Sequence, residues 1–180
     1  MAKVQTQSLI YQCSKFVSCN ASVGDHSVEQ IDLGYSIRDL LVMRIKKVAY
    51  YLTLTNLPIV TFGASADQFS FGLSQDFHVV EASVAANPDD LAIVDYNSLS
   101  RGDCGTAANA IFFTDPMIVK TMMDIHPDGL PVHPASLYAW SYCNNAAAAT
   151  FDYRVVIHYD IQEITMEYYQ QLINQLLINR

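Results

Sequence analysis

Hydrophobic and polar residues alternate along most of this chain with a period close to two, the period of a β-strand that buries one face. The clearest case is residues 151–163, where aromatic and β-branched residues fill the odd positions and mostly polar residues fill the even ones. This pattern predicts a strand with a core side and a solvent side. Residues 41–55 predict a second long strand, which ends at Asn56 and Pro58. Both of its faces are apolar from residue 48 onward, so we expect an interior strand covered on both sides.

Shorter runs predict the remaining elements of the body of the chain. Strands are expected at residues 4–17, 27–33, 67–73, 77–85, 91–96 and 138–143, with loops at 18–27 and 97–106. Residues 107–113 fit either a strand or a buried helix, because a short apolar run has no decisive period. Residues 117–125 fit a short helix between prolines.

Residues 165–180 change to helical spacing. Thr165 fits the N-cap, and Glu167 lies in the first turn, where a carboxylate is favourable. The apolar residues that recur at helical spacing are Tyr169, Leu172, Ile173, Leu176 and Leu177. No Lys or Arg precedes Arg180 in this segment, so the basic face of a membrane-surface helix is missing. We expect an amphipathic helix that packs on protein, and its apolar stripe suggests an interface element.

About eight short strands with turn signals, without a βαβ alternation or a repeat of 20–50 residues, favour an antiparallel sandwich or barrel. The predicted fold class is all-β, a jelly-roll β-sandwich with a short C-terminal α-helix. A length of 180 residues suits a single domain over residues 1–180.

Composition adds an expectation about assembly. The chain is 51% hydrophobic and 16% charged, with eleven tyrosines. A lone soluble chain keeps large apolar patches away from water, so this composition favours a protein that assembles. The net charge of −8 argues against a dedicated nucleic-acid binder, which needs a basic stripe. No apolar run approaches the length that spans a bilayer, and the first fifteen residues lack the layout of a signal peptide.

The sharpest local motif is Gly102-Asp103-Cys104-Gly105. It resembles the nucleophile turn of the chymotrypsin-like cysteine proteases of RNA viruses, which are small β-barrel enzymes. That resemblance implies Cys104 as nucleophile, with His78 or His26 as base and Asp95 or Glu81 as the orienting acid. Thr106 stands where the family has a second glycine, the Gly-x-His substrate-pocket element is absent, and 76 residues follow the cysteine. The alternative is a glycine-bounded turn between two strands.

Two further groups of residues could carry chemistry. The loop 124–134 contains Asp124, His126, Asp128 and His133, which could converge on one metal ion, although ordinary turn chemistry also explains Pro-Asp-Gly. Arg44, Lys46 and Lys47 are the one basic cluster, and three charges within a strand indicate an edge or a solvated face. The four cysteines form no CxxC pair and are expected to be free buried thiols; the alternative is disulfides, since four cysteines permit three pairings.

Two segments carry a fold-level resemblance to a known family. Residues 29–33, with the strand around Arg44–Val48, are similar to the early strands of small single jelly-roll viral capsid proteins. Residues 153–161, running into 165–169, resemble their closing strand and terminal helix. The resemblance implies a virion shell subunit without catalytic residue, metal or cofactor, which contacts copies of itself and other virion proteins.

Capsid proteins that package single-stranded genomes often carry a basic arm. The first forty residues hold only Lys3, Lys15 and Arg38, so we expect no nucleic-acid binding through a basic arm. The alternatives from other classes are the Cys104 protease and a non-catalytic β-sandwich binding module.

Overall fold

The computed structural model describes residues 10–20, 25–36, 38–55, 68–77, 88–90, 92–100, 104–107, 110–113, 117–144 and 150–177. The strands are β1 (Tyr11–Asn20), β2 (Asp25–Gln30), β3 (Leu41–Thr55), β4 (Gln68–Ser74), β5 (Ile93–Ser100), β6 (Cys104–Ala107), β7 (Ala110–Phe113), β8 (Met117–Thr121), β9 (Leu130–Val132), β10 (Tyr138–Asn144) and β11 (Thr150–Glu163). A 3-10 helix, η1 (Met122–Asp124), follows β8, and α2 (Met166–Leu177) follows β11.

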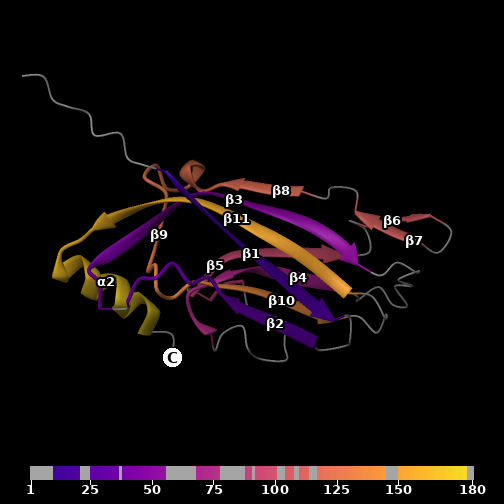
Figure 1. Cartoon of the computed structure of the whole chain (residues 1–180), viewed down its shortest axis with the longest axis horizontal. Helices are drawn as coiled ribbons and strands as arrows, with labels where there is room; N and C mark the ends of the chain where they lie inside the picture. The colour runs from indigo at the N-terminus through magenta and orange to yellow at the C-terminus, as the bar shows by residue number, and fades with distance from the viewer. Residues whose placement is uncertain are drawn as a thin grey trace, which may run out of the picture.

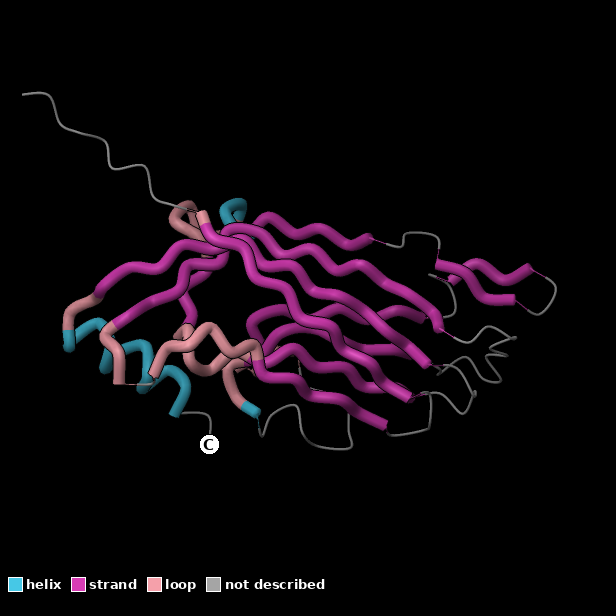
Figure 2. The backbone as a smooth tube through the Cα atoms, in the orientation of Figure 1, coloured by secondary structure: helices cyan, strands magenta, loops and turns pink. Residues whose placement is uncertain are grey.

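Two antiparallel sheets face each other across the core (Figure 1). Sheet A has the order β1-β11-β3-β8, with β9 also paired to β3, and sheet B has the order β2-β10-β4-β5. Figure 2 shows the two layers of strands and α2 at one end of the sandwich. The hairpin of β6 and β7 is a separate small sheet inserted between β5 and β8.

The strand pairing is nested from the two ends of the chain. The pairs β1 with β11, β2 with β10, β3 with β8 and β4 with β5 are all antiparallel, and β11 with β3 and β10 with β4 complete the sheets. Eight strands folded over in this way form a jelly roll. The predicted fold class, an all-β jelly-roll sandwich with a short C-terminal helix, is confirmed.

The core lies between the inner faces of the sheets. The prediction for residues 151–163 is confirmed on its core side, since Tyr153, Val155 and Ile157 are at most 1% exposed. The solvent side is wrong in part, because Asp152 and Asp160 are also buried. The Asp160 carboxylate forms an ion pair with Lys46, with Nζ and Oδ2 3.0 Å apart. This pairing offsets the cost of burying the charge of Asp160.

Residues 41–55 form the interior strand β3 as predicted. Strict alternation along this strand, however, assigns some of its residues to the wrong face. The pairing register skips one residue of β3 between Ile45 and Lys47, opposite His158 and Tyr159. This bulge at Lys46 shifts the parity of the strand. Ile45 and Val48 therefore both belong to the core.

The terminal helix begins where the sequence predicts. The Thr165 hydroxyl accepts a hydrogen bond from the Tyr168 backbone N–H at 3.3 Å, which is the geometry of an N-cap. Leu172 is 5% exposed within its own chain, and the Tyr169 ring lies edge-on to the His133 ring, with centroids 5.7 Å apart. The described part of the stripe thus packs on the sandwich instead of forming an external interface. No helix among the described residues is long and apolar enough to cross a membrane.

Three local predictions are wrong. Residues 117–125 form strand β8 and then η1 instead of one helix, because Ile118 and Val119 favour an extended backbone and β3 offers an edge to pair with. The expected loop 97–106 contains the end of β5 and the start of β6. Of the two alternatives for residues 107–113, the strand is confirmed, since they contain β7. The expected loop 18–27 is shorter, since β1 reaches Asn20 and β2 starts at Asp25. The expected strand 77–85 lies, after Phe77, outside the described residues.

Candidate functional site

A polar network joins the two sheets inside the sandwich. The Asp95 carboxylate of β5 is 7% exposed and accepts a hydrogen bond from the Tyr50 hydroxyl of β3, at 2.6 Å. Lys120 of β8 donates to the other carboxylate oxygen at 2.6 Å, and the Asn97 amide donates at 3.1 Å. A buried carboxylate is expensive unless it is paired and hydrogen-bonded, and three strands supply these partners here.

The network also keeps the Tyr50 hydroxyl protonated. Burial, and then the negative charge of Asp95, raise the pKa of Tyr50 well above its usual value of 10.0. Tyr50 therefore stays neutral and remains a hydrogen-bond donor at physiological pH. The Lys120 ammonium also donates to the Tyr96 backbone carbonyl at 3.0 Å. These contacts make the network a clamp between the edges of the two sheets.

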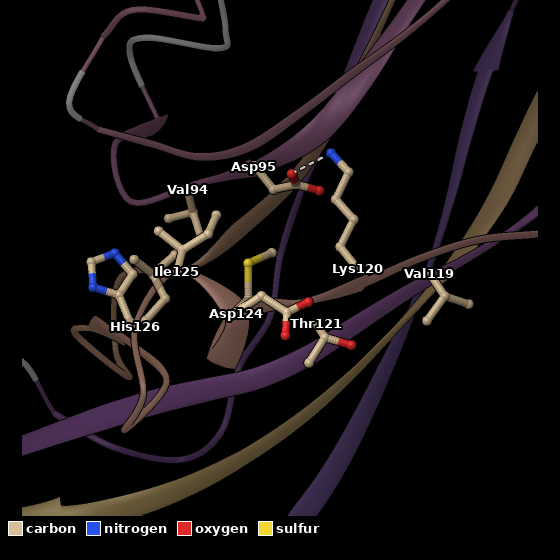
Figure 3. A pocket seen from close by; sticks show the side chains of 10 residues that line it. Val94, Asp95, Val119, Lys120, Thr121, Asp124, Ile125 and His126 are labelled. Carbon is tan, nitrogen blue, oxygen red and sulfur yellow. Dashed lines mark hydrogen bonds and ion pairs between the residues drawn. The ribbon is translucent and has the colours of Figure 1, made fainter.

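A groove of about 640 Å³ opens beside this network, between β5 and β8 (Figure 3). Apolar and polar side chains line it in equal number, and they come from both strands, from η1 and from the segment that follows η1. The Asp95 to Lys120 ion pair lies on one side of the groove, and Ile125 and His126 lie on the other. Because the Asp95 carboxylate already accepts hydrogen bonds from three donors, it is not free to bind a ligand in the groove.

The proposed protease residues do not come together in the described part of the chain. His26 lies on β2 and Asp95 on β5, the opposite edges of sheet B, with β10 and β4 between them. Three inter-strand spacings separate those edges by about 14 Å, so His26 and Asp95 form no dyad. Cys104 is the first residue of β6, which places it in a hairpin strand. His78 and Glu81 lie outside the described residues.

The residues of loop 124–134 that were expected to converge on a metal ion do not come together either. His133 is fully buried beneath α2, and its Nδ1 accepts a hydrogen bond from the Ala135 backbone N–H at 3.2 Å. His126, Asp124 and Asp128 are exposed. Within the ranges that the structure describes, no group of three or more His, Cys, Asp or Glu residues could hold a metal ion.

The basic cluster and the cysteines have structural explanations. Arg44, Lys46 and Lys47 lie in an interior strand, so the edge alternative is wrong. The solvated face holds for Lys47, which is exposed, whereas Lys46 forms an ion pair with Asp160. Cys13 is a free, half-buried thiol, and burial raises its pKa to about 11. A thiol with that pKa is protonated at neutral pH and is a poor nucleophile.

Comparisons with known proteins agree with the strand topology. No family model matches the chain, and no curated protein matches its sequence. Among solved structures, VP1 of Trichodysplasia spinulosa-associated polyomavirus in complex with 3'-sialyllactose is similar over 87% of this chain and 96% of its own, with a TM-score of 0.51 and 8% identity. The fold is similar to that of a viral capsid protein. The resemblance inferred from the early and closing strands is thereby confirmed, at the level of the fold.

Two other viral proteins show weaker likeness. The structure of tomato aspermy virus matches over 92% of this chain and 84% of its own, with a TM-score of 0.45 and 8% identity. The decameric BFDV capsid protein matches over 87% of this chain and 99% of its own, with a TM-score of 0.41 and 7% identity.

Sequence reasoning found Asp95 but gave it the wrong partners. Its true partners, Tyr50 and Lys120, stand 45 and 25 residues away along the chain. No local spacing marks such a network, because the topology of the sheets creates it. The one available signal is a lysine among apolar residues in Ile118-Val119-Lys120, which indicates a cation that needs a partner.

Proposed function

We propose that this chain is a structural subunit of a viral shell that assembles with copies of itself. The observation that carries the proposal is the nested pairing of eight strands into a jelly roll, whose fold is similar to a polyomavirus VP1 over nearly the whole of that protein. In this proposal residues 1–180 form one shell-building domain located in the virion. Other virion proteins are further partners, and no basic arm contacts the genome.

Composition and surface support the same function. Several large apolar side chains are well exposed on the described surface, and Phe16, Tyr51 and Ile125 are 51%, 45% and 75% exposed. Burying such side chains against a neighbouring copy is favourable by about 25 cal/mol per Å² of apolar area. Tyrosine is a frequent anchor at protein interfaces.

The proposed role is non-enzymatic. The Cys104 protease required an acid that orients a histidine, whereas the described contacts of Asp95 are with Tyr50, Asn97 and Lys120. A sandwich of two facing sheets also differs from the barrel of the chymotrypsin-like enzymes. A non-catalytic binding module would share the fold and bind a ligand, but would not form a closed shell.

The test is the mass of the purified full chain by light scattering, followed by negative-stain imaging of the heaviest fraction. Closed particles or large regular oligomers are expected, and Cys104→Ala should assemble like the parent chain. A uniform 20.1 kDa species under all conditions would refute the shell function. Peptide or ester turnover that Cys104→Ala abolishes would instead establish the protease.

A further inference from the structure

The outer face of sheet A has an exposed aromatic row. The register aligns Phe16 of β1, Arg154 of β11, Tyr51 of β3 and Met117 of β8 across all four strands. Phe16, Tyr51 and Met117 are 51%, 45% and 44% exposed, and Arg154 is exposed between the two aromatic residues. We refer to Phe16, Tyr51, Met117, Arg154 and the adjacent Val119 as the sheet A patch. Cross-strand alignment of this kind creates one continuous surface.

The patch is hollowed at its centre. Phe16, Tyr51 and Arg154 surround a depression of about 480 Å³ whose fourth lining residue is Val156. Val156 is 8% exposed although it points away from the core, so the surrounding side chains already exclude water from it. An apolar floor with aromatic and guanidinium walls is typical of a pocket that receives an anchor residue from a partner.

The exposed charge on this face is positive. Arg154 and Lys47 are exposed, and no ion pair holds either of them among the described residues. The two carboxylates that the register places on the same face, Asp152 and Asp160, are 4% and 3% exposed. The chain as a whole carries a net charge of −8. Exposed carboxylates lie outside the strands of sheet A, at Asp124, Asp128 and Glu167.

We infer that the sheet A patch is the surface by which one copy of this chain contacts an acidic surface of a second copy. The inference rests on the proposed function and adds the location of a contact. A two-fold contact of the patch with itself would bring like charges together, whereas a contact with a different, acidic surface pairs opposite charges. Such head-to-tail contacts generate closed rings and extended assemblies, as a shell requires.

Nucleic acid is the other partner that a positive face could bind. The patch favours a protein partner, because three of the four residues that line its depression are apolar or aromatic. Among the described residues of this face, the exposed cations are Arg154 and Lys47. Counterion release from nucleic acid needs several phosphate contacts for useful affinity.

The experiment uses the full chain with two substitutions in the patch and a matched control for each. Arg154→Glu reverses the charge, and Tyr51→Ser removes the aromatic wall. Arg38→Glu makes the same charge change on an exposed loop residue, and Tyr35→Ser removes a tyrosine that is 37% exposed outside the patch. Circular dichroism and melting temperature establish that each variant folds, and light scattering and negative-stain imaging measure assembly.

We expect Arg154→Glu and Tyr51→Ser to fold like the parent and to raise the protein concentration needed for assembly at least tenfold, while both control variants assemble like the parent. Normal assembly of both patch variants would overturn the inference and leave the proposed function intact. A parent chain that never assembles would instead overturn the proposed function, and the patch contact with it. Binding of a labelled 30-nucleotide single strand by the parent, lost in Arg154→Glu while assembly persists, would assign the patch to nucleic acid and refute the copy contact.

Discussion

Replacing Tyr50 with phenylalanine tests the clamp between the two sheets. The substitution removes the hydroxyl that donates to Asp95 at 2.6 Å and keeps the ring. The ring lies edge-on to Phe71, with centroids 5.3 Å apart, and also contacts Tyr153 at 5.8 Å. Phenylalanine can keep both contacts, so the loss isolates one hydrogen bond to a buried carboxylate.

The expected loss follows from the type of bond. A hydrogen bond to a charged group contributes about 1.5–3 kcal/mol, and a buried acceptor left with one donor fewer adds to the cost. Lys120 and Asn97 still hold the carboxylate, so we expect the free energy of unfolding to fall by about 2 kcal/mol. For a chain of this size that corresponds to a melting temperature lower by about 4–8 °C.

The assay is urea unfolding at one fixed protein concentration, because assembly adds a concentration-dependent stability of its own. The matched control is Tyr51→Phe, which removes the same hydroxyl from the next residue of β3, where the side chain is 45% exposed. We expect the control to change stability by less than about 0.5 kcal/mol. Equal losses for the two variants, or a loss below 0.5 kcal/mol for Tyr50→Phe, would refute the buried bond to Asp95.

Four further substitutions test other parts of the fold. Gly72→Ala should cost about 3 kcal/mol in urea unfolding, because a Cβ there would overlap the Asp95 backbone carbonyl; Gly34→Ala, at φ +77° in open space, should cost about 1 kcal/mol. Burial lowers the pKa of His133 below its usual 6.5, against the opposing charge of Asp39, so the unfolded chain binds a proton that the folded chain does not. Thermal melts should therefore show stability falling as the pH drops below 6.5, and His133→Phe should flatten that slope. Leu172→Ala should cost about 2 kcal/mol if α2 packs on its own sandwich, whereas an unchanged melting temperature would indicate a loosely attached helix.

The long elements were predictable because their periodicity is sustained. Residues 151–163 and the terminal helix each carry enough repeats for the period to be unambiguous, and Thr165 marks the helix start. Short segments were predicted unevenly, since pairing with a neighbour also decides their state. The strands expected at 67–73 and 138–143 correspond to β4 and β10, whereas the segment after Pro116 was predicted wrongly. Residues 117–121 lie extended because β3 is available, and that partner stands about seventy residues earlier in the chain.

The other obstacle to prediction was the face of the strand on which each residue lies. Alternation identifies two faces of a strand but cannot reveal one extra residue, and the bulge at Lys46 exchanges the faces on one side of it. The same bulge brings Lys46 to Asp160, which explains a buried carboxylate on the side expected to face solvent. The network around Asp95 could not be predicted for a related reason, because its side chains come from three separate strands.

Consecutive residues of β3 therefore have separable roles. Tyr50 points into the sandwich, where it is fully buried and bound to Asp95, while Tyr51 points outward from the same strand in the sheet A patch. A strand with both faces apolar at this point is needed if one face holds the subunit together and the other contacts a second copy. On this view Tyr50→Phe should lower stability without changing the contact surface, and Tyr51→Ser should weaken assembly without lowering stability. Opposite effects from two adjacent residues would link the apolar pattern of β3 to both folding and assembly.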